Sequence, residues 1–297
     1  MRGCDDLFRF FGKQSIHLLI NSEEITSESS AKTFAVFFAM TTSNSQLKRF
    51  GLIGFPLEHS FSKKYFTEKF QRENLADCNY ENFPIENISE FPSLIKSQPD
   101  LLGLNVTIPY KEQAIPFLDE LDATVKEIGA VNTIKISDRE DSFGERKLKG
   151  FNTDVYGFMQ SLLPLLETSH THALVLGTGG SSKAVAFGLK KMGIDFRFVS
   201  RNPEMQNELS YAELDKDLIR LHKIIINCTP VGMFPNVDEC PPLPFEYLTP
   251  SHLLFDLIYN PEETLFLQKG KSQGAKTKNG MEMLQLQAEK SWEIWNS

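Results

Sequence analysis

The 297-residue chain is poor in cysteine. It has four, Cys4, Cys78, Cys228 and Cys240, and they form no CxxC pair and no metal-like pattern with the histidines. This scatter argues against a disulfide-rich secreted scaffold and against a zinc-finger type of site. We therefore expect reduced thiols in a cytoplasmic protein, and no bound metal.

Long basic tracts and long apolar runs are also lacking. The formal net charge is −8, so the electrostatic attraction that nucleic-acid binding needs is missing. The apolar stretch "TFAVFFAM", residues 33–40, is far too short to cross a bilayer. We expect neither a nucleic-acid partner nor a membrane contact.

The first 45 residues keep neither a helical nor a strand period. Lys32 before the apolar stretch is a faint signal-peptide feature, but it stands far from residue 1 and no small-residue cleavage site follows. Met40 leads directly into the first convincing strand. We therefore interpret residues 1–45 as an extension that is disordered or not part of the native chain, with Met40 as the natural start, and the fold argument leaves out residues 1–39.

The remaining chain has the pattern of a soluble α/β protein. Its length favours two domains, and a chain of this size buries roughly 70–75% of its unfolded surface. Short β-like runs alternate with amphipathic helices from residue 49 on, which is typical of a parallel α/β sheet. Two α/β units joined near residues 150–155, with a small-molecule cleft between them, are predicted.

The expected elements follow from apolar periodicity, with the polar stretch 137–147 as a hairpin or surface loop. The expected strands are 49–54, 101–106, 131–136, 172–177, 195–200, 223–228 and 253–257, and the expected helices are 62–75, 88–95, 121–128, 156–166, 185–192 and 280–295.

A glycine-rich turn in "HALVLGTGGSSKAVAFGL" lies between an expected strand and an expected helix. Gly177, Gly179 and Gly180 would let the backbone turn tightly and approach a pyrophosphate, whose charge would rest on the helix N-terminus. Ser181 adds a hydroxyl, whereas the third glycine of GxGxxG is replaced by Ser182. A dinucleotide site is the favoured interpretation, and an ordinary strand–helix turn is the alternative.

The end of the next expected strand indicates which dinucleotide. NAD sites place a carboxylate about 20 positions past the glycines, whereas here the strand ends in Ser200 and Arg201. A guanidinium pairs with a 2′-phosphate that a carboxylate would repel. We predict NADP, although Glu204 lies close by and Arg201 could instead be a surface charge.

Polar residues also gather where elements of the first half begin or end. Ser60 and Ser62 stand at a probable helix start, where they would either cap the helix or hold a substrate carboxylate. Asn105 and Thr107 alternate along a strand before Lys111, which by itself could be a solvated loop charge. Two further polar residues follow, Asn132 in "GAVNTI" and Asp154 in "GFNTD", the latter at a helix start where it could also be a cap.

Together these segments resemble the shikimate dehydrogenases. The resemblance runs over residues 49–295 through eight motifs in order: "GLIGFPLEHSFS", "NVTIPYKE", "DATVKEIGAVNTI", "GFNTD", "LGTGGSSKAV", "NCTPVGM", "DLIYNPEETLFL" and "NGMEMLQLQAEKSWEIW". It implies a substrate-binding and catalytic domain over 46–149, with the C-terminal helix 280–297 packing back on it, and a Rossmann-like NADP-binding domain over 150–279.

The resemblance also implies roles for individual residues. Lys111 and Asp154 would be the catalytic pair in the NADPH-dependent reduction of 3-dehydroshikimate to shikimate, with either one as the formal acid or base. An ammonium next to the ketone oxygen stabilises the developing alkoxide and donates a proton. The carboxylate would bind Ser60 and Ser62; the ring hydroxyls would bind Asn105, Thr107, Asn132, Asp154 and Gln287, with Tyr259 nearby. The cofactor would contact Gly177, Thr178, Gly179, Gly180, Ser181, Ser200, Arg201, Leu257 and Gly280.

Three alternatives stay open at this point. One is a quinate or quinate/shikimate dehydrogenase with broader cofactor use. Another is a non-catalytic paralogue that senses shikimate or NADP(H), which loss of Lys111 or Asp154 would have favoured. The third is a tetrahydrofolate-linked or amino-acid dehydrogenase of similar design, which would not explain the serine pair. Either a monomer or a homodimer fits the sequence.

Overall fold

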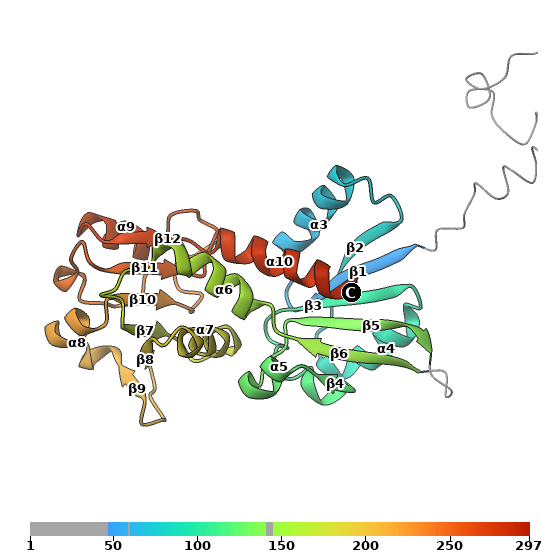
Figure 1. The fold of residues 1–297 in the computed structure, drawn as a ribbon, viewed down its shortest axis with the longest axis horizontal. Coiled ribbons are helices and arrows are strands. Elements are labelled where there is room, and N and C mark those ends of the chain that lie inside the picture. The colour runs from blue at the N-terminus through green and yellow to red at the C-terminus, as the bar shows by residue number, and fades with distance from the viewer. Residues whose placement is uncertain (1–46, 59, 141–144) are drawn as a thin grey trace, which may run out of the picture. The chain divides into compact units, whose positions relative to one another are not determined.

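A computed structural model describes residues 47–58, 60–140 and 145–297 (Figure 1). The extension predicted over residues 1–45, with its start at Met40, lies outside the described residues. Two six-stranded sheets form the described part, one in each half of the chain, and helices pack against both. The predicted α/β class with two α/β units is confirmed.

The first sheet has the order β2-β1-β3-β5-β6-β4. Its strands are β1 (Lys48–Gly54), β2 (Cys78–Pro84), β3 (Leu101–Val106), β4 (Glu120–Leu121), β5 (Thr133–Glu140) and β6 (Arg146–Phe151). The helical segments of this half are α3 (Phe61–Arg72), η1 (Ile88–Glu90), α4 (Phe91–Ser97), η2 (Ile115–Phe117) and α5 (Ala123–Ile128).

This first sheet is mixed, although the sequence pattern suggested parallel strands. β1 pairs in parallel with β2 and β3, but β5 is antiparallel to both β3 and β6. The segment between β5 and β6 is far too short for a parallel crossover, which needs a dozen or more residues. The described ends of the polar stretch 137–147 therefore belong to two antiparallel strands, as in the hairpin that was one of the two alternatives left open by the sequence.

Sequence analysis missed the edge strand β2. Its residues, "CNYENFP", include two asparagines and a glutamate, and only Tyr80 among them is fully buried. Such a polar strand has little apolar alternation to detect. Its seven residues nevertheless pair in register with β1 from Lys48 to Gly54, so the hydrogen bonds to the neighbouring strand define it.

The second sheet has the order β12-β11-β10-β7-β8-β9, and all its pairs are parallel. Its strands are β7 (His172–Leu176), β8 (Asp195–Ser200), β9 (Glu208–Ser210), β10 (Ile224–Asn227), β11 (Leu253–Asp256) and β12 (Lys276–Lys278). The helical segments of this half are α6 (Asp154–Leu162), η3 (Leu163–Leu165), α7 (Gly180–Lys191), η4 (Tyr211–Glu213), α8 (Lys216–Leu221), η5 (Phe245–Tyr247), α9 (Leu265–Ser272) and α10 (Met281–Trp295).

Strand β7 lies at the point where the strand order of this second sheet reverses. The chain continues from β7 to β8 on one side, whereas β10 pairs with β7 on the other side. Open α/β sheets bind ligands beyond the carboxyl ends of the strands at such a switch point. The glycine-rich turn follows β7 directly, so the fold places it where a dinucleotide would bind.

Helix α10 runs along α6, as Figure 1 shows, and its end packs on the first sheet. Trp295 stacks on Phe50 with ring centroids 5.0 Å apart and donates from Nε1 to the Ile134 carbonyl at 3.0 Å. Trp295 is thus a packing residue of the first sheet. Besides apolar residues, the buried face of α10 carries Gln287 and Ser291.

Arg146 ties the start of β3 to the end of α4, and its loss should destabilise the fold. Its guanidinium donates to four backbone carbonyls, those of Ile95, Gln98, Pro99 and Leu101, at 2.7 to 3.0 Å. Removing a charged donor from partly buried acceptors costs several times an ordinary hydrogen bond, so we expect Arg146→Ala to lower the unfolding free energy by about 3 kcal/mol. Urea unfolding measures this change.

Arg72→Ala is the matched control, because Arg72 is exposed and, in the described part of the chain, its side chain makes a single hydrogen bond, to Glu73 at 3.3 Å. We expect this control to change stability by less than about 0.5 kcal/mol. Equal shifts for the two variants would contradict the structural role given to Arg146.

Candidate active site

Lys111 and Asp154 form a close ion pair between the loop after β3 and the first turn of α6. The Lys111 Nζ to Asp154 Oδ2 distance is 2.7 Å, and the side chains are only 13% and 9% exposed. The same ammonium lies 3.1 Å from Ser181 Oγ, in the glycine-rich segment. The structure thus joins the two residues predicted to be catalytic to the predicted nucleotide loop, and Lys111 is not a solvated loop charge.

Asn132 holds the other oxygen of this carboxylate. Its Nδ2 donates to Asp154 Oδ1 at 2.8 Å, and its Oδ1 accepts from the Thr153 amide at 2.7 Å. The helix N-cap is Thr153, so Asp154 is a first-turn residue, and among the described residues its carboxylate bonds to the side chains of Lys111 and Asn132 and not to free helix amides. Both carboxylate oxygens are therefore fixed, and the capping alternative for Asp154 is not supported.

Gln287 reaches this cluster from α10 through its side-chain oxygen. Oε1 lies 3.3 Å from Asn132 Nδ2 and 3.4 Å from Thr153 Oγ1. Among the described residues, no hydrogen bond is recorded from Gln287 Nε2. This amide nitrogen has two donors, which leaves it able to donate to a ligand.

Asn105 and Thr107 lie at the end of β3. Asn105 is 4% exposed and makes hydrogen bonds to Tyr80, to the Asn132 carbonyl and to Ser291. Thr107 follows the last residue of the strand, is half-buried, and donates its amide to the Ile53 carbonyl at 3.0 Å. The two predicted side chains are thus adjacent to the loop that carries Lys111.

Ser60 and Ser62 stand at the start of α3. Ser60 occupies the N-cap position, but its side chain makes no capping bond, and its buried Oγ has no hydrogen-bond partner among the described residues. The capping alternative is therefore wrong for Ser60, and a buried hydroxyl of this kind calls for a ligand or water partner. Tyr259 lies at the same helix start, with its ring centroid 5.5 Å from that of Phe61.

The glycine-rich loop has the geometry that a phosphate needs. Gly177 has a φ of 97°, which L side chains rarely adopt, and it donates its amide to the Val199 carbonyl at 2.8 Å. A Cβ on Gly180 would lie 3.3 Å from Lys111 Cβ, so glycine permits a close approach there. Thr178 and Gly179 complete the turn before the twelve-residue helix α7. These residues fit a pyrophosphate at the end of a helix dipole.

Arg201 lies just past β8, and the described contacts include none between it and the cluster around Lys111. It is exposed, and no ion pair in the described part of the chain involves it. Burial raises the pKa of Tyr211 to about 12, and the positive charge of Arg201 offsets part of that rise. Ser200 Oγ accepts from the Asn202 amide at 3.2 Å. An exposed, unpaired guanidinium at this strand end fits a 2′-phosphate.

Leu257 and Gly280 are in direct contact. A Cβ on Gly280 would collide with the Leu257 carbonyl oxygen, and the Gly280 amide donates to the Ile258 carbonyl at 3.0 Å. The two residues that the resemblance assigned to the nicotinamide side therefore lie together, at the ends of β11 and of the segment before α10.

Comparisons with known proteins identify the family. Residues 52–134 match the shikimate dehydrogenase substrate-binding domain. A shikimate dehydrogenase (NADP(+)) of Desulforamulus reducens is 37% identical over 280 residues, covering 85% of this chain and 91% of that relative. The chain belongs to the shikimate dehydrogenase family.

Solved structures of the family share its fold. Shikimate dehydrogenase 1 from Peptoclostridium difficile has a TM-score of 0.71 at 38% identity, covering 84% of this chain and 91% of that one. Shikimate 5-dehydrogenase from Thermus thermophilus, solved in complex with NADP(H) and shikimate, has a TM-score of 0.72 at 30% identity, covering 84% and 93%. The resemblance to the shikimate dehydrogenases is confirmed.

The segment that matches the family's substrate-binding domain contains six of the predicted site residues. They are Ser60, Ser62, Asn105, Thr107, Lys111 and Asn132. Asp154 and Gln287 lie outside it and join the same cluster only through the tertiary contacts described above. Folding therefore brings predicted site residues of the matched segment together with residues of α6 and α10.

Sequence analysis missed four buried polar residues of the site: Tyr80, Thr133, Thr153 and Ser291. Thr133 and Thr153 each stand next to a predicted residue, and their hydroxyls lie 3.2 Å apart. Ser291 follows Gln287 by one helical turn, so a second polar residue on the apolar face of the closing helix was an available signal. Tyr80 gave no such signal, because it lies on the polar edge strand β2.

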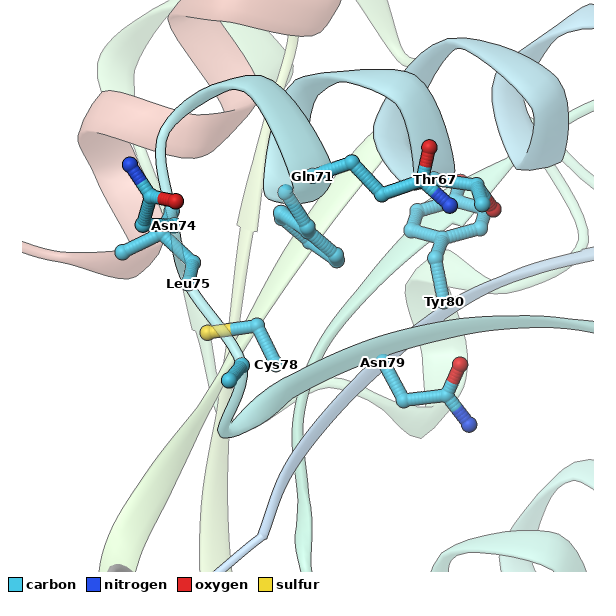
Figure 2. A pocket seen from close by; sticks show the side chains of 9 residues that line it. Thr67, Gln71, Asn74, Leu75, Cys78, Asn79 and Tyr80 are labelled. Carbon is cyan, nitrogen blue, oxygen red and sulfur yellow. The ribbon is translucent and has the colours of Figure 1, made fainter. Parts of the chain in front are cut away.

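A surface pocket of about 390 Å³ lies between α3 and β2, and of the site residues named above it includes Tyr80 (Figure 2). It is lined by Thr67, Phe70, Gln71, Asn74, Leu75, Ala76, Cys78, Asn79 and Tyr80. Burial raises the pKa of the Cys78 thiol to about 11, so this cysteine is not a reactive thiolate at neutral pH. This pocket therefore offers no reactive thiolate.

Asp256, fully buried at the end of β11, should make stability depend on pH. It accepts from Asn227, Thr264 and the Ile258 amide, but burial outweighs these bonds and raises its pKa to about 6. Because the folded protein binds this proton more tightly than the unfolded chain does, the stabilising contribution is present at low pH and is lost as pH rises through about 6.

We expect the unfolding free energy of the wild type, relative to that of Asp256→Asn, to fall by about 3 kcal/mol as pH rises from roughly 4 to roughly 7. Asparagine stays neutral, so its own pH profile lacks this contribution. Urea unfolding at several pH values measures both profiles, and parallel profiles would show that Asp256 does not titrate in this range.

Proposed function

We propose that this chain catalyses the reversible NADPH-dependent reduction of 3-dehydroshikimate to shikimate, a step toward chorismate and the aromatic amino acids. The observation that carries the proposal is the Lys111–Asp154 pair at 2.7 Å, next to the glycine-rich loop through Ser181. A proton donor beside a dinucleotide site is what reduction of a ketone to an alcohol requires.

We further propose the division of labour within the chain. Residues 46–149, with the helix 280–297, form the substrate-binding and catalytic domain, and residues 150–279 form the NADP-binding domain. The contact of Trp295 with Phe50 in the first sheet supports the assignment of the closing helix. The glycine-rich loop at the switch point of the second sheet supports the assignment of the cofactor.

The mechanism follows from the positions of the side chains. NADPH, when bound, supplies the hydride that reduces the ketone carbon. Lys111 lies where an ammonium can stabilise the developing alkoxide and donate a proton to the same oxygen, which completes the alcohol. In the reverse direction the Lys111–Asp154 pair accepts that proton. Asn132 keeps the carboxylate in place for both directions.

Substrate contacts follow the same logic. We propose that Ser60 and Ser62 bind the carboxylate at the start of α3, with Tyr259 nearby. The unpartnered Ser60 Oγ supports this assignment. The free amide nitrogen of Gln287 would donate to a ring hydroxyl. Asn105, Thr107, Asn132 and Asp154 would complete the ring site.

We also propose the cofactor contacts, the cellular compartment and the oligomeric state. Gly177 to Ser181 would cradle the pyrophosphate, Ser200 and Arg201 would hold the adenosine 2′-phosphate, and Leu257 and Gly280 would line the nicotinamide. No helix in the described residues is long and apolar enough to span a bilayer. The cysteines of the described part, Cys78, Cys228 and Cys240, form no disulfide, which fits the reducing cytoplasm. The working form would be a monomer or a homodimer.

An initial-rate assay of the full chain tests the proposal. Shikimate and quinate are each offered with NADP⁺ and with NAD⁺, and reduction of the cofactor is followed by absorbance. We expect fast turnover with shikimate and NADP⁺ alone. Turnover with quinate or NAD⁺ would favour a quinate/shikimate dehydrogenase with broader cofactor use. A folded sample that is silent in all four assays would favour a non-catalytic sensor.

A further inference from the structure

Hydrogen bonds to described residues use both donor hydrogens of the Asn105 side-chain amide and one of the two acceptor positions of its oxygen. Tyr80 OH lies 2.8 Å from its Oδ1, and its Nδ2 lies 3.0 Å from Ser291 Oγ. The same nitrogen is 3.3 Å from both the Asn132 carbonyl and Thr133 Oγ1. An amide nitrogen has two hydrogens and its oxygen accepts two bonds. Both hydrogens are therefore engaged within the protein, and one lone pair of Oδ1 is left.

The neighbouring donors and acceptors fix which side of the Asn105 side-chain amide carries the oxygen and which carries the nitrogen. Ser291 Oγ donates to the Gln287 carbonyl at 2.9 Å and also lies 2.8 Å from Thr133 Oγ1, where either hydroxyl could be the donor. The Asn132 carbonyl, 3.3 Å from Asn105 Nδ2, is an acceptor without a proton. A reversed amide would place Oδ1 against this carbonyl and would lose the bond from Nδ2 to Ser291 Oγ. The nitrogen therefore faces the Asn132 carbonyl and Ser291, and the oxygen faces Tyr80.

Tyr80 completes this orientation from the opposite end. It is 1% exposed on the edge strand β2, and Ser291 is fully buried on α10. Burial raises the pKa of Tyr80, and a hydrogen bond from Ser62 offsets part of that rise. The phenol donates its proton to Asn105 Oδ1 at 2.8 Å. The orientation of Asn105 thus depends on contacts from β2 and α10.

We infer that Ser291 and Tyr80 are positioning residues that make Asn105 present its oxygen, and not its nitrogen, to the substrate. Asn105 then selects a ring hydroxyl that donates a hydrogen bond, and it rejects a group that can only accept, such as a carboxylate. This inference rests on the proposed function, which places Asn105 at the substrate ring.

Substrate analogues test the direction of this bond in the full chain. Each of the two non-reacting ring hydroxyls of shikimate is replaced in turn by hydrogen or by fluorine, and binding is measured by calorimetry without cofactor. Fluorine accepts weakly but never donates. At the position that Asn105 contacts, we expect the fluoro analogue to bind no better than the deoxy analogue, and both about tenfold more weakly than shikimate. Fluoro analogues that bind better than deoxy analogues at both positions would overturn the inference.

Ser291→Ala tests the positioning role. We expect it to weaken shikimate binding about tenfold and to narrow the preference for hydroxyl over hydrogen at that same ring position, with NADP⁺ binding unchanged. Ser161→Ala is the matched control: Ser161 is 1% exposed in α6, its hydroxyl donates to the Phe158 carbonyl at 3.0 Å, and no contact with Asn105 is recorded. We expect Tyr80→Phe to repeat the Ser291→Ala pattern.

The outcomes separate this inference from the proposed function. If Ser291→Ala leaves the hydroxyl preference unchanged at both positions, or weakens shikimate and NADP⁺ binding alike, Ser291 does not position Asn105. Wild-type turnover of shikimate in the same preparation would then leave the proposed function intact. A folded wild type that binds no shikimate would overturn both.

Discussion

Lys111→Ala should reduce kcat with shikimate about a thousandfold while the affinity for NADP⁺ changes less than about threefold. Among the described residues, the Lys111 ammonium is the one charged donor that pairs with Asp154, at 2.7 Å. Its removal takes away both the proton source and the charge that stabilises the alkoxide, which act mainly in the transition state. Initial rates give kcat, and fluorescence or calorimetric titration gives the NADP⁺ affinity.

Lys126→Ala is the control for this prediction, because Lys126 is an exposed lysine on α5 and no ion pair is recorded for it. We expect it to behave as the wild type. Removing one partner of a half-buried pair also destabilises the protein, so the thermal unfolding of each variant is recorded first. A parallel loss of kcat and of NADP⁺ affinity in folded Lys111→Ala would contradict the catalytic role.

Arg201→Ala should raise the dissociation constant of NADP⁺ about 30-fold and leave that of NAD⁺ within about threefold. The two cofactors differ only in the 2′-phosphate, and Arg201 is an exposed guanidinium without an ion pair in the described part of the chain. Losing a charge-assisted pair to that phosphate therefore changes the ratio of the two affinities. Titration of the variant with both cofactors measures the ratio.

Arg220→Ala is a suitable control, because Arg220 is exposed in the last turn of α8. We expect it to leave both affinities unchanged. An NADP⁺/NAD⁺ ratio that stays at the wild-type value in Arg201→Ala would remove Arg201 from the cofactor site.

The sequence was most informative where a local pattern has a local physical cause. The strand–glycine–helix pattern around Gly177 and Gly180 predicted the turn, because only glycine accepts that backbone and that close approach. Buried runs such as β7 and β10 were predicted from their apolar residues alone. Polar β2 was missed, because its partner strand and not its own composition makes it a strand.

The residues of the candidate site also fall into those that the sequence indicated and those that it missed. Residue types and motif order indicated Lys111, Asp154 and Asn105, because their neighbours in the chain carry the signal. Nothing local indicated Tyr80, and the only local signal for Ser291 was its place on the apolar face of the closing helix, since each residue acts through a contact with a residue far away in the chain. Ser291 meets Asn105 across 186 positions and Tyr80 meets it across 25.

By itself, the sequence determined the α/β class, the nucleotide loop and the family resemblance, because these depend on backbone preferences and side-chain types in short segments. Only the tertiary structure decided that the Ser60 hydroxyl makes no capping bond, that Asn132 and Lys111 each bond one oxygen of Asp154, and that the Asn105 amide has one orientation. Hydrogen bonds have direction and finite capacity, so these outcomes depend on which donors and acceptors the fold brings within about 3 Å of each other.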